Sequence, residues 1–395
     1  MRNRGESCTW LGDHTRSPSS FRSRECTSTG AARRTDHTVG LVAKRMARAS
    51  ASTFPGAAGS VSRVVLLAPG RSGSTLLQSA FLSSCDVLTF FEPCHHGAGG
   101  GGDVLHGKCV RHIKRFLSCD LPKKNGRWDP PSIRPWLQHP YNAANTSCTR
   151  PPFASAEKMQ AVCHSARLVL VKEIRLVGKL QQLAATLTRH YLQQHPRPPA
   201  RSVAIVHLVR DPRPTLASQR RLHWWKFGNT SLQSKQQLAH EMARVAKHLC
   251  RGILADVTAG ERLQRNEASL IRYVPVRFEE LATNLAATTE RLYGALGLLP
   301  VPHTTQEWIQ RTLSGQCAHG DAASANNEST LEKFEYSTCR SKTAPSRGAH
   351  GRWKHDLSRL EKRAIARGCA TAMARLGYGA QAQGGTTRRQ DVRSL

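Results

Sequence analysis

The stretch that decides the fold is Arg63-Val-Val-Leu-Leu-Ala-Pro-Gly-Arg-Ser-Gly-Ser-Thr75. Its first half, 63–68, is a continuous apolar run of strand length, which is typical of a parallel strand buried on both faces. Pro69 and Gly70 end the run, and 74–84 has the spacing of a helix with an apolar face. A strand, a glycine-containing turn and a helix together form a place where unpaired N–H groups and the helix dipole favour an anion.

The turn itself carries groups suited to phosphate. Gly70 and Gly73 permit unusual dihedrals and a close approach, and Arg71 offers a planar fork of donors. The hydroxyls of Ser74 and Thr75 can cap the helix or bind phosphate oxygens. The turn is too short for an ATP-type loop and lacks its lysine. A single phosphate or phosphosulfate group is the better fit, and the alternative is a serine-capped helix without a ligand.

A second strand end repeats this logic. The apolar run 202–209 ends at Arg210, a helix is predicted from Pro212, and Ser218 lies about two turns into it. If the chain bends back at the strand end, Ser218 comes near Arg210, at the edge where open α/β sheets bind ligands. The alternative is an ion pair between Arg210 and Asp211 or another nearby carboxylate. Two such sites on one sheet suggest a nucleotide phosphorylated at both ends.

The other elements predict an α/β fold with three layers around a central, mostly parallel sheet. Strands are expected at 87–91, 168–174 and 270–276. One helix is expected between the strand 168–174 and residue 193, and others over 235–257 and 279–296. The segment 97–152 is rich in Gly, Pro, His and Lys and is expected to be an irregular insertion. We expect one domain over 61–380, with disordered tails at 1–60, which is basic, and 381–395.

Composition narrows the partner and the compartment. Fifty-eight Lys and Arg against 27 Asp and Glu give a net charge of +31, which indicates a polyanionic partner: nucleic acid, anionic membrane or acidic polysaccharide. The 12 cysteines form no C-x-x-C pair, so a zinc ribbon is not expected. Abundant cysteine and the sequons at Asn145, Asn229 and Asn327 favour a disulfide-permitting lumen, with Cys317–Cys339 as one candidate pair, and free buried thiols are the alternative. No apolar run reaches transmembrane length.

Four motifs in order resemble the PAPS-dependent sulfotransferases. Arg71–Thr75 resembles their 5′-phosphosulfate loop, and Arg210 with Ser218 resembles their 3′-phosphate pair. Val276-Arg-Phe-Glu-Glu-Leu281 is similar to the family's R-Y-E-D-L segment, and 346–353 to its closing loop. The resemblance spans about 63–378, and the most similar branch is the carbohydrate 6-O-sulfotransferases that act on Gal, GalNAc or GlcNAc. It implies the P-loop-like sulfotransferase fold.

The resemblance also implies roles for individual residues in binding PAPS. The residues expected to hold the 5′-phosphosulfate are Arg71, Ser72, Gly73, Ser74 and Thr75. Arg210 and Ser218 are expected at the 3′-phosphate, assisted by Arg347 and Gly348 of the closing loop. Phe278 takes the position of a tyrosine that borders adenine, where it can stack but not donate a hydrogen bond. Lys172 is expected near the bridging region of the donor.

The catalytic base implied by the resemblance is a carboxylate. Cytosolic sulfotransferases carry a histidine two residues after the strand lysine, but this chain has Ile174 there. Glu92, at the end of the second strand, is therefore the candidate base for a sugar 6-hydroxyl. Its alternative role is a structural ion pair with a nearby arginine, and His95 and His96 are alternative bases. No metal is expected.

The acceptor implied is an acidic glycan of keratan or chondroitin type, or one that ends in GlcNAc, and not a nucleic acid. Exposed basic residues such as Arg220 and Arg221 beside Trp224 are expected to guide it. The family works in the Golgi lumen and is usually membrane-anchored, although no anchor is visible in this sequence. Two alternatives stay open: a nucleotide kinase or ATPase that needs Mg²⁺, and a non-catalytic basic module that binds polyanions.

Overall fold

The computed structural model describes residues 61–84, 86–94, 103–121, 123–124, 127–128, 156–194, 203–222, 224, 234–314 and 352–379. The two predicted tails, the candidate pair Cys317–Cys339 and the three sequons lie outside these ranges. Across the part of the chain that is described, no helix is both long enough and apolar enough for a membrane crossing.

The centre of the molecule is a five-stranded sheet in which every pairing is parallel. Its strands are β1 (Arg63–Leu67), β2 (Val87–Phe91), β5 (Leu168–Glu173), β6 (Val203–Val209) and β7 (Ile271–Arg277), in the order β2-β5-β1-β6-β7. β5 and β6 are buried along their whole length, as the continuous apolar runs predicted. A separate antiparallel pair joins the two-residue strands β3 (Lys123–Lys124) and β4 (Arg127–Trp128).

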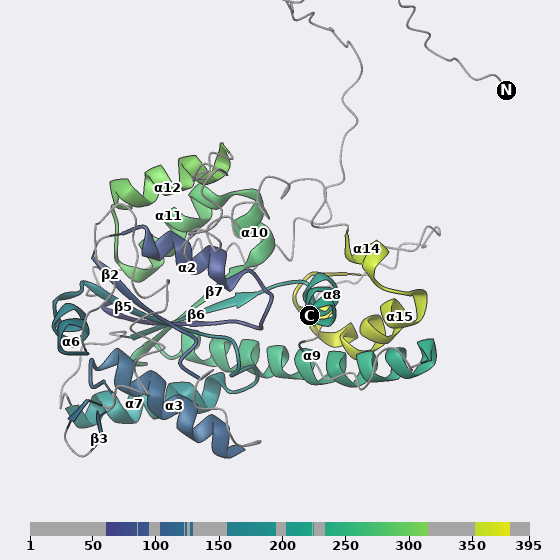
Figure 1. Ribbon diagram of the computed structural model, residues 1–395, viewed down its shortest axis with the longest axis horizontal. Coiled ribbons are helices and arrows are strands. Elements are labelled where there is room, and N and C mark those ends of the chain that lie inside the picture. The colour runs from purple at the N-terminus through teal and green to yellow at the C-terminus, as the bar shows by residue number, and fades with distance from the viewer. Residues whose placement is uncertain are drawn as a thin grey trace, which may run out of the picture.

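Helices cover both faces of the sheet, so the predicted three-layer α/β fold is confirmed (Figure 1). One face carries α2 (Ser74–Leu82), α10 (Phe278–Thr283), α11 (Leu285–Leu296) and α12 (His303–Leu313). The other carries α3 (Asp103–Leu117), α7 (Leu180–Gln194) and α9 (Lys235–Arg265), and α6 (Ala156–Ser165) lies at one end. Each face has its own apolar core, because strand side chains alternate between the two sides.

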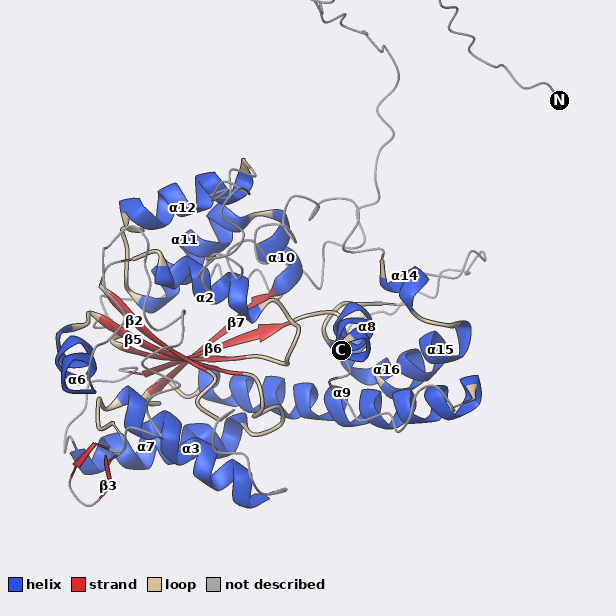
Figure 2. Ribbon diagram, in the orientation of Figure 1, coloured by secondary structure: helices blue, strands red, loops and turns tan. Residues whose placement is uncertain are grey.

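A group of short helices lies beside the carboxyl ends of the strands (Figure 2). It consists of α8 (Pro212–Arg221), α14 (Trp353–Asp356), α15 (Arg359–Gly368) and α16 (Ala370–Arg375), packed on α9 around a third apolar cluster. A disulfide between Cys250 of α9 and Cys369, which follows α15, fastens the carboxyl-terminal helices to the core.

The prediction of an irregular segment over 97–152 was wrong for its first part, where α3 forms. Val110, Ile113, Phe116 and Leu117 are buried at helical spacing on α3, but the Gly, His and Lys residues around them hide this stripe in the sequence. Two disulfides, Cys94–Cys109 and Cys119–Cys163, also anchor the segment. Disulfide pairing, which the cysteine count favoured, is therefore confirmed for six cysteines.

Two helix boundaries also differ from those expected. The helix predicted over 279–296 is broken into α10 and α11 at Asn284, whose side chain accepts a hydrogen bond from the Ala287 N–H at 3.2 Å and so caps α11. The helix predicted over 235–257 continues to Arg265, and its last turns bury Ala259 and Gly260. A Cβ at Gly260 would lie 2.1 Å from the Tyr273 ring, so the glycine allows close packing on β7.

Candidate active site

The predicted site residues converge at the carboxyl edge of the sheet. Arg71 follows β1, Glu92 follows β2, Lys172 is the penultimate residue of β5 and Arg210 follows β6. The chain crosses from β1 to β2 on one side and from β5 to β6 on the other, so β1 marks the point where the strand order reverses. Parallel sheets bind their ligands outside the carboxyl ends at such a point.

The phosphate loop leads into α2 with an open helix end. Gly73 is the N-cap at φ 91°, and among the described residues no side chain caps this end. The alternative of a serine-capped helix is therefore not what the structure shows. A Cβ at Gly73 would lie 2.3 Å from the Phe278 ring, so the loop needs glycine both for its dihedral and for this contact. Arg71 also has a positive φ of 68°, which is strain of the kind found at functional sites.

The second predicted site lies directly against the loop. Arg71 Nε donates to Ser218 Oγ at 3.1 Å, and Arg210 donates from its terminal nitrogen to the Arg71 carbonyl at 3.0 Å. The Arg210 guanidinium lies 4.0 Å from the Phe278 ring centroid. Asp211 is bound instead by Arg213, at 2.6 Å, so the alternative pairing of Arg210 with Asp211 is not the one that forms. Arg210 and Ser218 therefore both contact Arg71, one at its backbone carbonyl and the other at its side chain.

Positive charge is crowded at these two strand ends. Burial lowers the pKa of Arg71, and the charge of Arg221 lowers it further. Burial likewise lowers the pKa of Arg210, and Arg71 adds to this although Glu279 and Asp211 oppose it. Within the described residues, Ser72 Oγ and Arg210 Nε are buried without a hydrogen-bond partner. Such unpaired donors are costly unless a ligand satisfies them, and phosphate oxygens are acceptors of the right charge.

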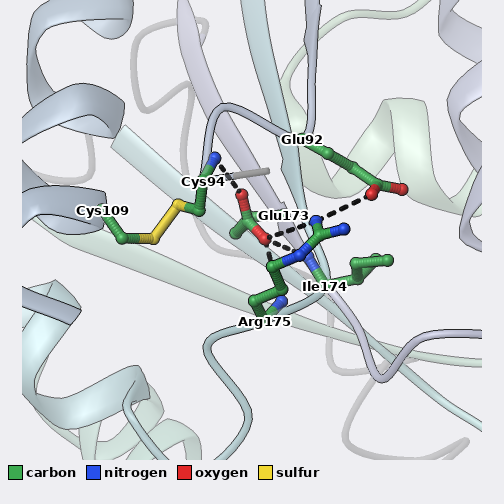
Figure 3. Close-up of a disulfide and its surroundings, with 6 residues drawn as sticks. All are labelled: Glu92, Cys94, Cys109, Glu173, Ile174 and Arg175. Atoms are coloured by element: carbon green, nitrogen blue, oxygen red, sulfur yellow. Dashed lines mark hydrogen bonds and ion pairs between the residues drawn. A yellow bond between two sulfur atoms is a disulfide. The ribbon is translucent and has the colours of Figure 1, made fainter. Parts of the chain in front are cut away.

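Lys172 and Glu92 form the centre of a second group. Lys172 Nζ lies 2.9 Å from Glu92 Oε1 and 3.3 Å from Thr75 Oγ1, and 3.7 Å above the Phe91 ring. Arg175 binds the other oxygen, Glu92 Oε2, at 2.8 Å (Figure 3). The Glu92 backbone has φ 47°, and its N–H donates to the Lys172 carbonyl at 2.8 Å. The side chain of Glu92 is thus fixed by its own backbone and by β5.

The electrostatics keep Glu92 charged. Burial alone would raise the pKa of Glu92, but the charges and hydrogen bonds of Lys172 and Arg175 outweigh it and hold the pKa below its usual range. Burial lowers the pKa of Lys172, although Glu92 opposes this shift. The ion pair that the sequence left open as an alternative for Glu92 is therefore present. A carboxylate has about four acceptor positions, so a hydroxyl can still donate to it beside these partners.

Sequence reasoning missed several residues that shape this site. Arg175 and Glu173 were given no role, although charged residues at the end of a buried strand and just after it are a signal that finds them. Gln219 donates to the Gly70 carbonyl at 2.8 Å. A Cβ at Gly70 would lie 2.8 Å from the Trp224 ring, so this ring packs closely on the phosphate loop. Ile174, in the place of the cytosolic histidine, is buried in the core.

Other expectations have different outcomes. Arg347, Gly348, His95 and His96 lie outside the described residues, so their predicted roles stay predictions. Trp353, which follows the predicted closing loop, is described and lies 4.9 Å below the Arg213 guanidinium.

The two arginines expected to guide a glycan have partners within the protein. Arg220 lies 2.9 Å from Glu361, and Arg221 lies 3.4 Å from Asp356. They therefore fasten α8 to α14 and α15, and are less available to a glycan than their sequence position suggested.

One cluster of possible metal ligands occurs among the described residues: Cys94, Cys109 and Glu173. The two sulfurs are joined in a disulfide, which removes the thiolates that a metal would need. The Glu173 carboxylate is already bound by three backbone N–H groups. These groups do not fit a metal, and we assign no metal chemistry to them.

Comparisons with known proteins agree with this geometry. Carbohydrate sulfotransferase 1 of Mus musculus is 24% identical over 356 residues, covering 80% of this chain and 79% of that protein. Carbohydrate sulfotransferase 5 of Homo sapiens is 27% identical over 346 residues, covering 80% and 77%. The model of the sulfotransferase family matches residues 63–301, which include both phosphate-binding strand ends and the Lys172–Glu92 pair. The chain belongs to the sulfotransferase family.

Proposed function

We propose that this enzyme transfers the sulfuryl group of PAPS to the 6-hydroxyl of Gal, GalNAc or GlcNAc in a glycan or proteoglycan. One observation carries the proposal: at one edge of the sheet, Arg71 and Arg210 meet at an open helix end, and Lys172 links that helix to Glu92. The carbohydrate sulfotransferases that resemble this chain support a sugar as the acceptor. The choice of the 6-hydroxyl rests on the resemblance of the motifs.

The donor is bound by the two strand ends. The open end of α2 and residues 71–75 receive the 5′-phosphosulfate, since this end offers backbone N–H groups and the positive pole of the helix. Arg210 and Ser218 receive the 3′-phosphate, and Phe278 borders the adenine. Arg71 Nε donates to Ser218 Oγ, so the two proposed phosphate sites are adjacent. Arg347 and Gly348 close over the donor, a role supported by the anchoring of Trp353 against Arg213.

The transfer is a direct displacement. A bond forms between the sugar oxygen and sulfur, the bond from sulfur to the bridging oxygen breaks, and 3′,5′-ADP leaves with the electron pair. Lys172 and Arg71 offset the charge that develops on the leaving phosphate. Glu92 accepts the proton of the sugar hydroxyl. The lowered pKa of Glu92 keeps it ionised, and the proton moves late, as the hydroxyl becomes acidic on bonding to sulfur.

The acceptor and the compartment follow from the charge and the disulfides. A net charge of +31 favours an acidic glycan, of keratan or chondroitin type or ending in GlcNAc. Three disulfides fit an oxidising lumen, and we place the enzyme in the Golgi lumen.

The experiment that tests this function is transfer of labelled sulfate from PAPS to keratan, chondroitin and GlcNAc-terminated acceptors. Arg71→Ala and Glu92→Gln are expected to lower kcat/KM by about a hundred- to a thousandfold, as the loss of a transition-state contact does. Arg311→Ala, an exposed change on α12, is the control and keeps wild-type activity.

Three results would overturn parts of the proposal. Full activity of Arg71→Ala would remove the donor assignment. Turnover of ATP that requires Mg²⁺, with none of PAPS, would favour the kinase alternative. Binding of acidic glycans without any transfer would favour the non-catalytic module.

A further inference from the structure

A second buried carboxylate lies behind Glu92. Glu173 is the last residue of β5, and its side chain is fully buried. Its Oε2 accepts the Cys94 N–H at 2.9 Å, and its Oε1 accepts the N–H groups of Ile174 at 2.8 Å and Arg175 at 2.9 Å (Figure 3). One carboxylate therefore joins the turn after β2 to the turn after β5.

The same carboxylate also attracts the arginine that holds Glu92. The Nη1 atom of Arg175 lies 2.8 Å from Glu92 Oε2 and 3.6 Å from Glu173 Oε1, so it stands between two acids. Arg175 is only partly exposed. Glu173 thus contacts Arg175 twice: its carboxylate accepts the Arg175 backbone N–H, and its negative charge attracts the Arg175 guanidinium.

The turn that carries Glu92 is held from the other side as well. Cys94, two residues after Glu92, is bonded to Cys109 of α3 (Figure 3). The backbone carbonyl of Glu173 accepts the Ala68 N–H at 3.2 Å, at the start of the phosphate loop. Residues after three strands thus meet at Glu173.

Burying a carboxylate costs free energy, and hydrogen bonds to the carboxylate must offset that cost. Burial raises the pKa of Glu173, although the Cys94 N–H and Arg175 oppose the shift. Three backbone N–H groups donate hydrogen bonds to the Glu173 side chain. A carboxylate accepts all three, whereas a protonated acid has less capacity to accept them.

We propose that Glu173 is a positioning residue: it fastens the turn after β2 to the turn after β5 and so fixes the direction of Glu92 through Arg175 and Cys94. The inference rests on the proposed role of Glu92 as the base. It predicts that loss of the Glu173 carboxylate lowers kcat and leaves donor binding nearly unchanged, because the carboxylate bonds to the amides of Cys94, Ile174 and Arg175, which are not among the proposed donor residues.

The test uses Glu173→Gln, which keeps the volume but replaces one acceptor oxygen by an NH₂ group that faces a backbone N–H. We expect kcat to fall about ten- to a hundredfold, the effect of a small misplacement of a reacting group, while the KM for PAPS changes less than about twofold. Hydrogen exchange of the Cys94, Ile174 and Arg175 amides is expected to become faster.

A matched control separates positioning from folding. Asp256 is also a buried carboxylate that accepts two backbone N–H groups, those of Gly178 at 2.6 Å and Leu180 at 2.8 Å, and these hydrogen bonds involve neither Glu92 nor the two residues that bind it. Asp256→Asn is expected to lower stability and keep the wild-type kcat. A loss of kcat in Asp256→Asn as large as that in Glu173→Gln would reduce the effect to general destabilisation and overturn the inference.

A double-mutant cycle with Glu92→Gln completes the test. If Glu173 acts through Glu92, then Glu173→Gln has no further effect on kcat in the Glu92→Gln protein. An equal loss in both backgrounds contradicts the inference. A wild-type kcat for Glu92→Gln overturns the proposed base and this inference with it, whereas a wild-type kcat for Glu173→Gln beside an impaired Glu92→Gln overturns this inference alone.

Discussion

Gly73→Ala is the change that most directly tests how the phosphate loop is built. Gly73 has φ 91°, and a Cβ there would lie 2.3 Å from two atoms of the Phe278 ring. Both constraints are violated by a single methyl group. The ring must move, and in moving it leaves the Arg210 guanidinium that it now contacts at 4.0 Å.

The size of the effect follows from these two terms. An alanine in the left-handed region costs about 1–2 kcal/mol. The lost contact between Phe278 and Arg210 adds about 0.5–2 kcal/mol. We therefore expect the free energy of unfolding to fall by about 1.5–4 kcal/mol. Because Phe278 and Arg210 are proposed donor contacts, affinity for 3′,5′-ADP is expected to fall by roughly two- to thirtyfold as well.

Urea denaturation and calorimetric titration with 3′,5′-ADP measure the two effects. Gly107→Ala is the matched control: it lies inside α3 with nothing within 4 Å of its Cβ position, so it is expected to raise stability by about 0.5–1 kcal/mol. In a Phe278→Ala background, Gly73→Ala is expected to lower the free energy of unfolding only by the cost of the left-handed backbone, about 1–2 kcal/mol. If Gly73→Ala behaves like Gly107→Ala in both assays, the reasoning is refuted.

Three further predictions concern buried groups. Lys172→Met is expected to lower kcat about a hundred- to a thousandfold, and to move the acid limb of the kcat/KM profile to higher pH, because Lys172 lowers the pKa of Glu92. Burial raises the pKa of Asp256 from 3.8 to about 7, so its contribution to stability is complete below pH 3.8 and is lost as the pH rises through about 7; urea denaturation is expected to show this slope, and Asp256→Asn to flatten it. Replacing Cys250 and Cys369 together by serine opens a link across 119 residues, and the free energy of unfolding is expected to fall by about 4–5 kcal/mol in the same assay.

The strands were predictable because each is a mainly apolar run of strand length. The five expected strands form within one residue of their predicted limits. The phosphate loop was predictable for the same reason, since strand, glycine turn and helix are adjacent in sequence. The second site was predictable because a single bend of the chain, at the end of β6, separates Arg210 from the helix that carries Ser218.

Side-chain partners were less predictable because they depend on the order of the strands. Glu92 was expected beside an unspecified arginine, and it binds Lys172 and Arg175, which lie 80 and 83 positions away. Arg220 and Arg221 look like an exposed basic face in the sequence, but they pair with Glu361 and Asp356, which come more than a hundred residues later. The apolar stripe of α3 was hidden because Gly, His, Lys and Arg residues stand between its apolar residues.

The position of β5 between β1 and β2 is what unites the two halves of the site. In the sheet register, Lys172 stands beside Leu66 of β1 and Phe91 of β2. One lysine therefore reaches both Thr75, at the start of the donor helix, and Glu92, at the end of β2. With β5 at the edge of the sheet, Lys172 would have only one of these neighbours. Under the proposed function, a phosphosulfate that draws Lys172 toward itself would weaken the hold of Lys172 on Glu92, and the pKa of that carboxylate would rise. The strand order would then couple arrival of the proposed donor to readiness of the proposed base.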